Sequence, residues 1–223
     1  MNPRFRDRFE AGRTLAGRLG KYAGRDDVIV FGLPRGGVPV AFEVAHGIGA
    51  PLDVFIVRKI GVPWHEELAM GAIASGGVRL IDENLVRQLG LTADDVEQVV
   101  EQEQRELERR ERQYRGDRPF PDVTGRTGIL VDDGLATGAS MRVAVAALRQ
   151  EHPARIVVAV PIAPPDTCAT LREEADDVVC ALTPEPFYAV GLWYKDFTQT
   201  TDEEVHDLLT ESQYETSERR RAP

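Results

Sequence analysis

The stretch GILVDDGLATGAS, residues 128–140, joins an apolar run to two carboxylates and then to a loop of small residues. The apolar half is typical of a strand buried in a parallel sheet, and the loop leads into a predicted helix. Glycines and hydroxyls at a helix start, where the first N–H groups lack partners, form a seat for a phosphate. Asp132 and Asp133 could accept hydrogen bonds from a diol or hold Mg²⁺. A ligand whose phosphate and diol are separated by about the length of a ribose would fit both the phosphate seat and the acidic pair.

Strand, loop and helix alternate along most of the chain. This alternation predicts an α/β fold, with a parallel twisted sheet of about five strands flanked by helices. The sequence has 223 residues, which suits one domain with a full core. Strands are predicted over 28–33, 52–57, 127–133, 155–162 and 177–182, and helices over 139–150 and 166–175.

The segment between the second and third strands carries different signals. A β-hairpin is expected over 67–82, turning at 75–77. A long helix is expected over 92–114, opened by a capping box of Thr92 and Asp95. Its charges alternate in sign, which predicts a solvated face over the sheet or a dimer contact.

Charge and hydropathy exclude several classes of partner. The formal net charge of −10 disfavours non-specific binding to nucleic acid or to anionic membranes. No run approaches the roughly 18 apolar residues of a membrane span, and the first residues lack a signal-peptide core. The chain is therefore expected to be cytoplasmic. Cys168 and Cys180 lack metal-site spacing and are expected to be reduced thiols in the core.

Residues 128–140 resemble the 5-phosphoribosyl-1-pyrophosphate (PRPP) motif of type I phosphoribosyltransferases. The resemblance implies Mg²⁺-PRPP as the donor. It implies that Asp132 and Asp133 bind the ribose 2′ and 3′ hydroxyls, and that any contact of the pair with the metal is made through PRPP. It also implies a small hood. One domain is expected over 1–215, with its core at about 25–183, the hood from N-terminal residues and 184–210, and a polar tail over 216–223. The implied cradle of the 5′-phosphate is Ala136, Thr137, Gly138, Ala139 and Ser140.

Two further loops resemble parts of the same family. GLPRGGVPVA, at 32–41, is similar to the pyrophosphate loop, where backbone N–H groups, often beside a non-proline cis peptide, bind the leaving group. The residues carried over are Arg35, Gly36 and Gly37. After the second strand, Arg58 and Lys59 occupy a position where the family places basic residues against pyrophosphate, and both are assigned catalytic roles with the acidic pair.

The acceptor side is less defined by the resemblance. AVGLWYKDF, at 189–197, lies where purine enzymes place an aromatic residue and an aspartate around the base, which nominates Trp193, Tyr194 and Asp196. The alternative is that the aromatic residues pin the tail to the core. Residues 60–70, which include His65, are expected to be a mobile loop that closes over the site.

The predicted function is phosphoribosyl transfer from Mg²⁺-PRPP to a nitrogen acceptor, expected to be a nucleobase in purine or pyrimidine salvage, with release of pyrophosphate. The alternative is a non-catalytic PRPP- or nucleotide-binding regulator with the same fold. Homodimers are usual in the family and are expected here. RFRDR, ELAMGAIA and AVGLWYKDF resemble a bacterial branch of the family more than any enzyme named for a nucleobase.

Overall fold

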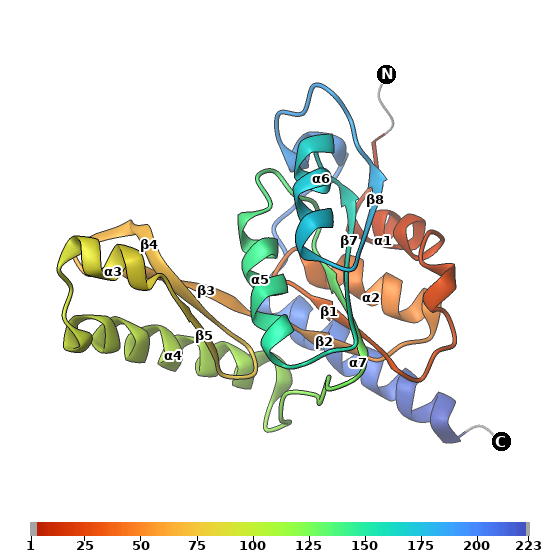
Figure 1. Ribbon diagram of the computed structural model, residues 1–223. Coiled ribbons are helices and arrows are strands. Elements are labelled where there is room, and N and C mark those ends of the chain that lie inside the picture. The colour runs from red at the N-terminus through yellow and green to blue at the C-terminus, as the bar shows by residue number, and fades with distance from the viewer. Residues whose placement is uncertain (1–3, 222–223) are drawn as a thin grey trace.

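A five-stranded parallel sheet forms the centre of the protein (Figure 1). The computed structural model describes residues 4–221. The strand order is β2-β1-β6-β7-β8, and every neighbouring pair is parallel. This confirms the predicted α/β sheet. The strands are β1 (Val28–Gly32), β2 (Leu52–Val54), β6 (Thr127–Val131), β7 (Arg155–Ile162) and β8 (Asp177–Leu182).

Alternate residues of the central strands pack on opposite faces of this sheet. Val28 and Val30 of β1 belong to the core cluster shared with α1 (Arg8–Ala16) and α2 (Gly37–Ile48). Ile29 and Phe31 belong to the cluster beneath α5 (Ala139–Gln150) and α6 (Pro165–Glu174). Both faces are therefore covered by helices, as Figure 1 shows, which explains the continuous apolar runs of these strands.

A second, antiparallel sheet projects to one side of the parallel sheet in Figure 1, where it lies beside a long helix. The turn at 75–77 and the Thr92–Asp95 capping box confirm the predicted hairpin and helix start. The expected mobile loop at 60–70 is wrong, because Gly61 and Pro63 fall in a bulged hairpin of two paired strands instead. This projection is called the arm: β3 (Val57–Val62), β4 (His65–Ala74), β5 (Val78–Ile81), α3 (Glu83–Leu89) and α4 (Ala93–Arg115).

A buried ion pair joins the arm to the parallel sheet. Arg115, the last residue of α4, donates from Nε to Asp53 Oδ1 at 2.9 Å and from Nη2 to the Val54 carbonyl at 3.1 Å. Both charged side chains are less than a tenth exposed. The end of α4 is thereby held against β2.

The C-terminal segment forms one continuous helix, α7 (Asp202–Arg221). Residues 216–221 of the expected polar tail belong to this helix, and the last two residues lie outside the described residues. The segment before α7 returns to the N-terminus, where Phe5 forms a β-bridge with Tyr194. Short 3₁₀ turns occur at η1 (Gly20–Tyr22) and η2 (Val190–Trp193).

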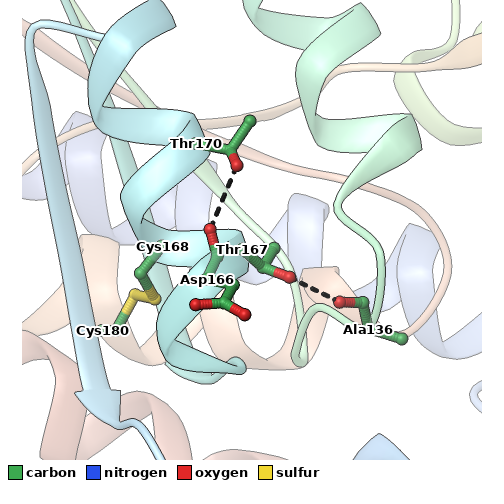
Figure 2. Close-up of a disulfide and its surroundings, with 6 residues drawn as sticks. All are labelled: Ala136, Asp166, Thr167, Cys168, Thr170 and Cys180. Atoms are coloured by element: carbon green, nitrogen blue, oxygen red, sulfur yellow. Dashed lines mark hydrogen bonds between the residues drawn. A yellow bond between two sulfur atoms is a disulfide. The ribbon is translucent and has the colours of Figure 1, made fainter.

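The two cysteines form a disulfide between α6 and β8 (Figure 2). The expectation of reduced thiols is thus wrong. Cys168 and Cys180 are 12 residues apart, and the chain folds back between them, so α6 packs on the strand that follows it. None of the helices within residues 4–221 combines the length and apolarity needed to cross a lipid bilayer.

Candidate functional site

The loops after β1 and β6 meet at the carboxyl edge of the parallel sheet. The two strands are neighbours in register, with Gly32 opposite Val131, so their loops leave the sheet together. A Cβ atom on Gly37 would lie 2.7 Å from the Val131 carbonyl oxygen, which shows how closely the backbones approach. In open α/β sheets this edge is where ligands bind.

Asp132 and Asp133 follow β6 directly and are both partly buried. The Asp133 N–H donates to Asp132 Oδ1 at 2.8 Å. Burial, together with repulsion from Asp133, raises the pKa of Asp132 well above its ordinary value. Burial also raises the pKa of Asp133, although the Arg8 guanidinium opposes this shift. Ionising both carboxylates therefore costs free energy, because burial and their mutual repulsion oppose it.

Two residues contact Asp133: Arg8, which the sequence prediction missed, and Tyr194, which it nominated for the acceptor instead. Arg8 Nε donates to Asp133 Oδ2 at 2.8 Å, and the Tyr194 hydroxyl donates to the Asp133 carbonyl at 2.5 Å. Burial, followed by the charge of Asp133, raises the pKa of Tyr194. The RFRDR stretch was one hint of Arg8, but no sequence pattern links positions 125 residues apart.

Each carboxylate of the pair keeps one oxygen without a protein partner. Asp132 Oδ1 and Asp133 Oδ2 accept the hydrogen bonds described above, whereas none of residues 4–221 donates to Asp132 Oδ2 or Asp133 Oδ1. No buried polar side-chain atom lacks a partner within that range, so both remaining oxygens reach solvent. The pair thus offers two acceptor atoms to a ligand.

The loop from 134 to 140 leads from the pair into α5. Gly138 caps this helix with φ +73°, a left-handed conformation that favours glycine. Among the described residues, no acceptor takes the N–H groups of Ala136, Thr137 and Gly138. The Thr167 hydroxyl donates to the Ala136 carbonyl at 2.7 Å, which anchors the loop to α6 (Figure 2). Exposed Ala139 and Ser140 begin the helix, so the loop has free donors and a positive helix end.

The loop after β1 contains a cis peptide bond between Pro34 and Arg35, which is not an X-Pro bond. The Arg35 side chain is exposed, and its guanidinium lies 3.8 Å from Asp202. Gly36 lies beside the acidic pair, since a Cβ atom there would be 2.2 Å from Asp133 Oδ2. The structure thus brings the predicted pyrophosphate loop next to the predicted ribose carboxylates.

Arg58 and Lys59 belong to the arm. The Arg58 guanidinium pairs with Glu103 at 2.5 Å and lies 3.9 Å from Glu106, so acidic groups of α4 already match its charge. Lys59 is exposed on β3. His65 is exposed at the start of β4, and its Nδ1 accepts from the Leu68 N–H at 3.2 Å. Within the described residues, no contact joins these side chains to the acidic pair.

The three residues nominated for the acceptor have different environments. Trp193 and Tyr194 are 7% and 4% exposed, so their rings pack inside the protein. Asp196 is exposed and accepts from the N–H and hydroxyl of Thr198. The contacts of the two aromatic residues are those of the packing alternative, and a role toward an acceptor stays a prediction.

The acidic pair offers two carboxylates to a metal ion and has no third protein ligand among the described residues. Nowhere in the described residues do three or more histidine, cysteine or acidic side chains gather as metal ligands. One of the two carboxylates is also bound by Arg8. A magnesium ion at these carboxylates would take its remaining oxygens from water or from a bound ligand.

Comparison with known proteins identifies the family. The model of the phosphoribosyl transferase domain matches residues 6–191. The chain belongs to this family. The match covers the β1 loop, the acidic pair and the loop before α5, and it confirms the resemblance found in the sequence.

Two proteins similar to this chain cover most of its length. A Mycobacterium tuberculosis protein, provisionally named a phosphoribosyl transferase, is 48% identical over 205 residues, which are 92% of this chain and 46% of the relative. The chain thus spans about half the length of this relative. A crystal structure of a Thermus thermophilus protein matches with 43% identity and a TM-score of 0.81, covering 93% of this chain and 98% of that one.

Proposed function

We propose that the protein transfers the 5-phosphoribosyl group of Mg²⁺-PRPP to a nitrogen acceptor, with release of pyrophosphate. The observation that carries the proposal is that two free carboxylate oxygens and a loop of free N–H groups lie close together in one chain segment, 132–138. A sugar phosphate presents a diol and an anion in that arrangement. Family membership supports the same donor.

The acidic pair and the loop before α5 would hold the ribose end of the donor. The remaining oxygens of Asp132 and Asp133 accept hydrogen bonds from the 2′ and 3′ hydroxyls. The N–H groups of Ala136, Thr137 and Gly138, with the hydroxyl of Ser140, surround the 5′-phosphate. The negative pair also stabilises positive charge that develops on the sugar ring as the bond at C1 lengthens.

The β1 loop would receive the leaving group. The C1–O bond breaks and its electron pair departs with pyrophosphate, while a nitrogen of the acceptor forms the new bond to C1 and loses its proton. The N–H groups of Arg35 and Gly36, which no acceptor among the described residues takes, lie beside the ribose carboxylates and would donate to the departing oxygens. The Gly37 N–H already donates to the Leu33 carbonyl at 3.0 Å, so Gly37 would contribute by letting the backbones approach closely. Mg²⁺ arrives as part of the donor and neutralises charge on the pyrophosphate. Arg58 and Lys59 could assist only if the arm moved toward this site.

The acceptor is proposed to be a nucleobase, used in salvage by a cytoplasmic homodimer. Its ring would approach the side of the site formed by the segment at 184–201, which packs against the N-terminus. The buried rings of Trp193 and Tyr194 leave exposed groups such as Asp196 as the candidates for direct contact.

A panel of acceptors tests the transfer. Purified protein is incubated with Mg²⁺-PRPP and each of adenine, hypoxanthine, guanine, xanthine, uracil and simple amines, and pyrophosphate release is measured. At least one acceptor should give release that depends on enzyme and acceptor, and Asp132→Asn with Asp133→Asn should abolish it. Release at the wild-type rate by the double variant would contradict the proposal. PRPP binding without release on any acceptor would instead favour the regulatory alternative.

A further inference from the structure

Arg8 connects the acidic pair to the segment that precedes α7. It is the first residue of α1, and its Nε donates to Asp133 Oδ2 at 2.8 Å. Its Nη1 donates to the Thr198 carbonyl at 2.7 Å, and its guanidinium carbon lies 4.0 Å from the centre of the Phe197 ring. Three separate parts of the chain therefore meet at one guanidinium.

The Arg8–Asp133 pair is well shielded from solvent. The side chains are 11% and 14% exposed, whereas most ion pairs within residues 4–221 have at least one partner that is more than a quarter exposed. A charge-assisted hydrogen bond in such a place is stronger and better oriented than one on the surface. The contact with Phe197 and the bond to Thr198 fix the guanidinium plane, so Asp133 is bound in one orientation.

This orientation determines which oxygen of Asp133 faces a ligand. Arg8 occupies Oδ2 and leaves Oδ1 open, while the Asp133 N–H occupies Oδ1 of Asp132 and leaves its Oδ2 open. Without Arg8, Asp133 would face Asp132 with no compensating charge, and repulsion would turn the two carboxylates apart. A vicinal diol requires both acceptors at a fixed separation.

We infer that Arg8 is a positioning residue that holds Asp133 in the orientation needed to bind one ribose hydroxyl of the donor. The inference rests on the proposed function. Arg8 touches neither the sugar nor the reacting atoms, and it acts through Asp133. Because it also holds Thr198 and Phe197, it joins the donor carboxylate to the segment nearest the proposed acceptor side.

A double-mutant cycle read by calorimetry with Mg²⁺-PRPP tests this role. Arg8→Met should weaken PRPP binding by about tenfold or more, the loss typical of a partly buried charge-assisted contact. Arg8→Lys keeps the charge but lacks the planar fork, and it should recover part of the affinity. In the background of Asp133→Asn, Arg8→Met should cause little further loss, because the group through which it acts has changed.

The control variant is Arg13→Met, on the same helix, whose side chain pairs with Glu43 and is half exposed. It should bind PRPP like the wild type. Equal PRPP affinity of wild type and Arg8→Met would overturn the inference. It would also be overturned if Arg8→Met weakened PRPP binding by the same factor in the wild type and in the Asp133→Asn background. If Arg8→Met does not fold, the same cycle is measured with Arg8→Lys, whose loss of PRPP affinity should likewise depend on Asp133. Failure of the wild type to bind PRPP would instead overturn the proposed function itself.

Discussion

Gly36 lies directly against Asp133: a Cβ atom added to the glycine would be 2.2 Å from the carboxylate Oδ2. The glycine itself has an ordinary helical backbone, with φ −61°. This position therefore requires glycine because there is no room for a side chain, and not because of its backbone conformation. The loop after β1 and the acidic pair after β6 can approach this closely because this position has no side chain.

Gly36→Ala should disturb donor binding more than folding. The methyl group would push the Asp133 carboxylate away from Arg8, and a displacement of this kind should raise KM for PRPP roughly 10- to 100-fold. Steady-state kinetics across PRPP concentrations measure the change. Gly20→Ala is the matched control, since no atom lies within 4 Å of its added Cβ. An unchanged KM in Gly36→Ala would show that the close contact does not matter for the donor.

Asp132→Asn should make the protein more stable at neutral pH although it removes activity. Burial and repulsion from Asp133 raise the pKa of Asp132 well above 3.8, so the folded chain holds this proton more tightly than the unfolded chain. The stability that this group contributes is present below 3.8 and is lost as the pH rises through the raised pKa. Asparagine never ionises and keeps an oxygen for the Asp133 N–H.

Urea unfolding at about pH 4 and about pH 7 measures this effect. The gain in the free energy of unfolding of Asp132→Asn should be about 1–2 kcal/mol near neutral pH, and it should shrink at the acidic pH. A variant that is less stable than wild type at neutral pH, or a gain of the same size under both conditions, would disagree with the raised pKa.

The ion pair of Arg115 and Asp53 should matter for stability rather than for catalysis. Arg115→Met would leave a buried carboxylate without its partner, which should lower the free energy of unfolding by about 3–5 kcal/mol. Arg105→Met, which breaks an exposed pair with Glu101 on the same helix, should cost about 0.5 kcal/mol or less. Urea unfolding of the two variants gives the comparison, and similar losses would refute the structural role of the buried pair.

The bond between Cys168 and Cys180 should be detectable by thiol titration. The unfolded protein should show no free thiol before reduction and two afterwards. Because the bond closes a short loop, reductant should lower the free energy of unfolding by about 3 kcal/mol. A variant with both residues changed to serine should have the same free energy of unfolding with and without reductant. Two free thiols in the protein before reduction would contradict the bond.

Much of the parallel sheet could be predicted from the sequence, because its strands are buried on both faces. Runs such as 155–162 are apolar at nearly every position and are separated by helices, and the structure keeps those bounds. The capping box at Thr92 likewise identified the start of α4 from local chemistry alone. These features depend on residues close together in the sequence.

The features that the sequence did not predict depend on contacts between distant segments or on weak local signals. The hairpin of β3 and β4 contains Gly61 and Pro63, which resemble loop residues because the register shifts at a bulge there. The Arg8–Asp133 pair joins positions 125 residues apart, and no local pattern records it. The place of the acidic pair and its loop at the carboxyl edge of the sheet could be predicted, because they follow a strand directly and lie close together in the sequence. Their roles toward a donor stay predictions.

The proposed function depends on a PRPP site at Asp132 and Asp133. Calorimetric titration of Mg²⁺-PRPP into the wild-type protein and into the double variant, Asp132→Asn with Asp133→Asn, tests this site directly. Circular dichroism confirms that both proteins are folded. We predict saturable binding by the wild type, with one donor per chain, and affinity at least about 100-fold weaker in the double variant. Equal affinity in the two proteins, or no binding by the folded wild type, would contradict a donor site at these carboxylates.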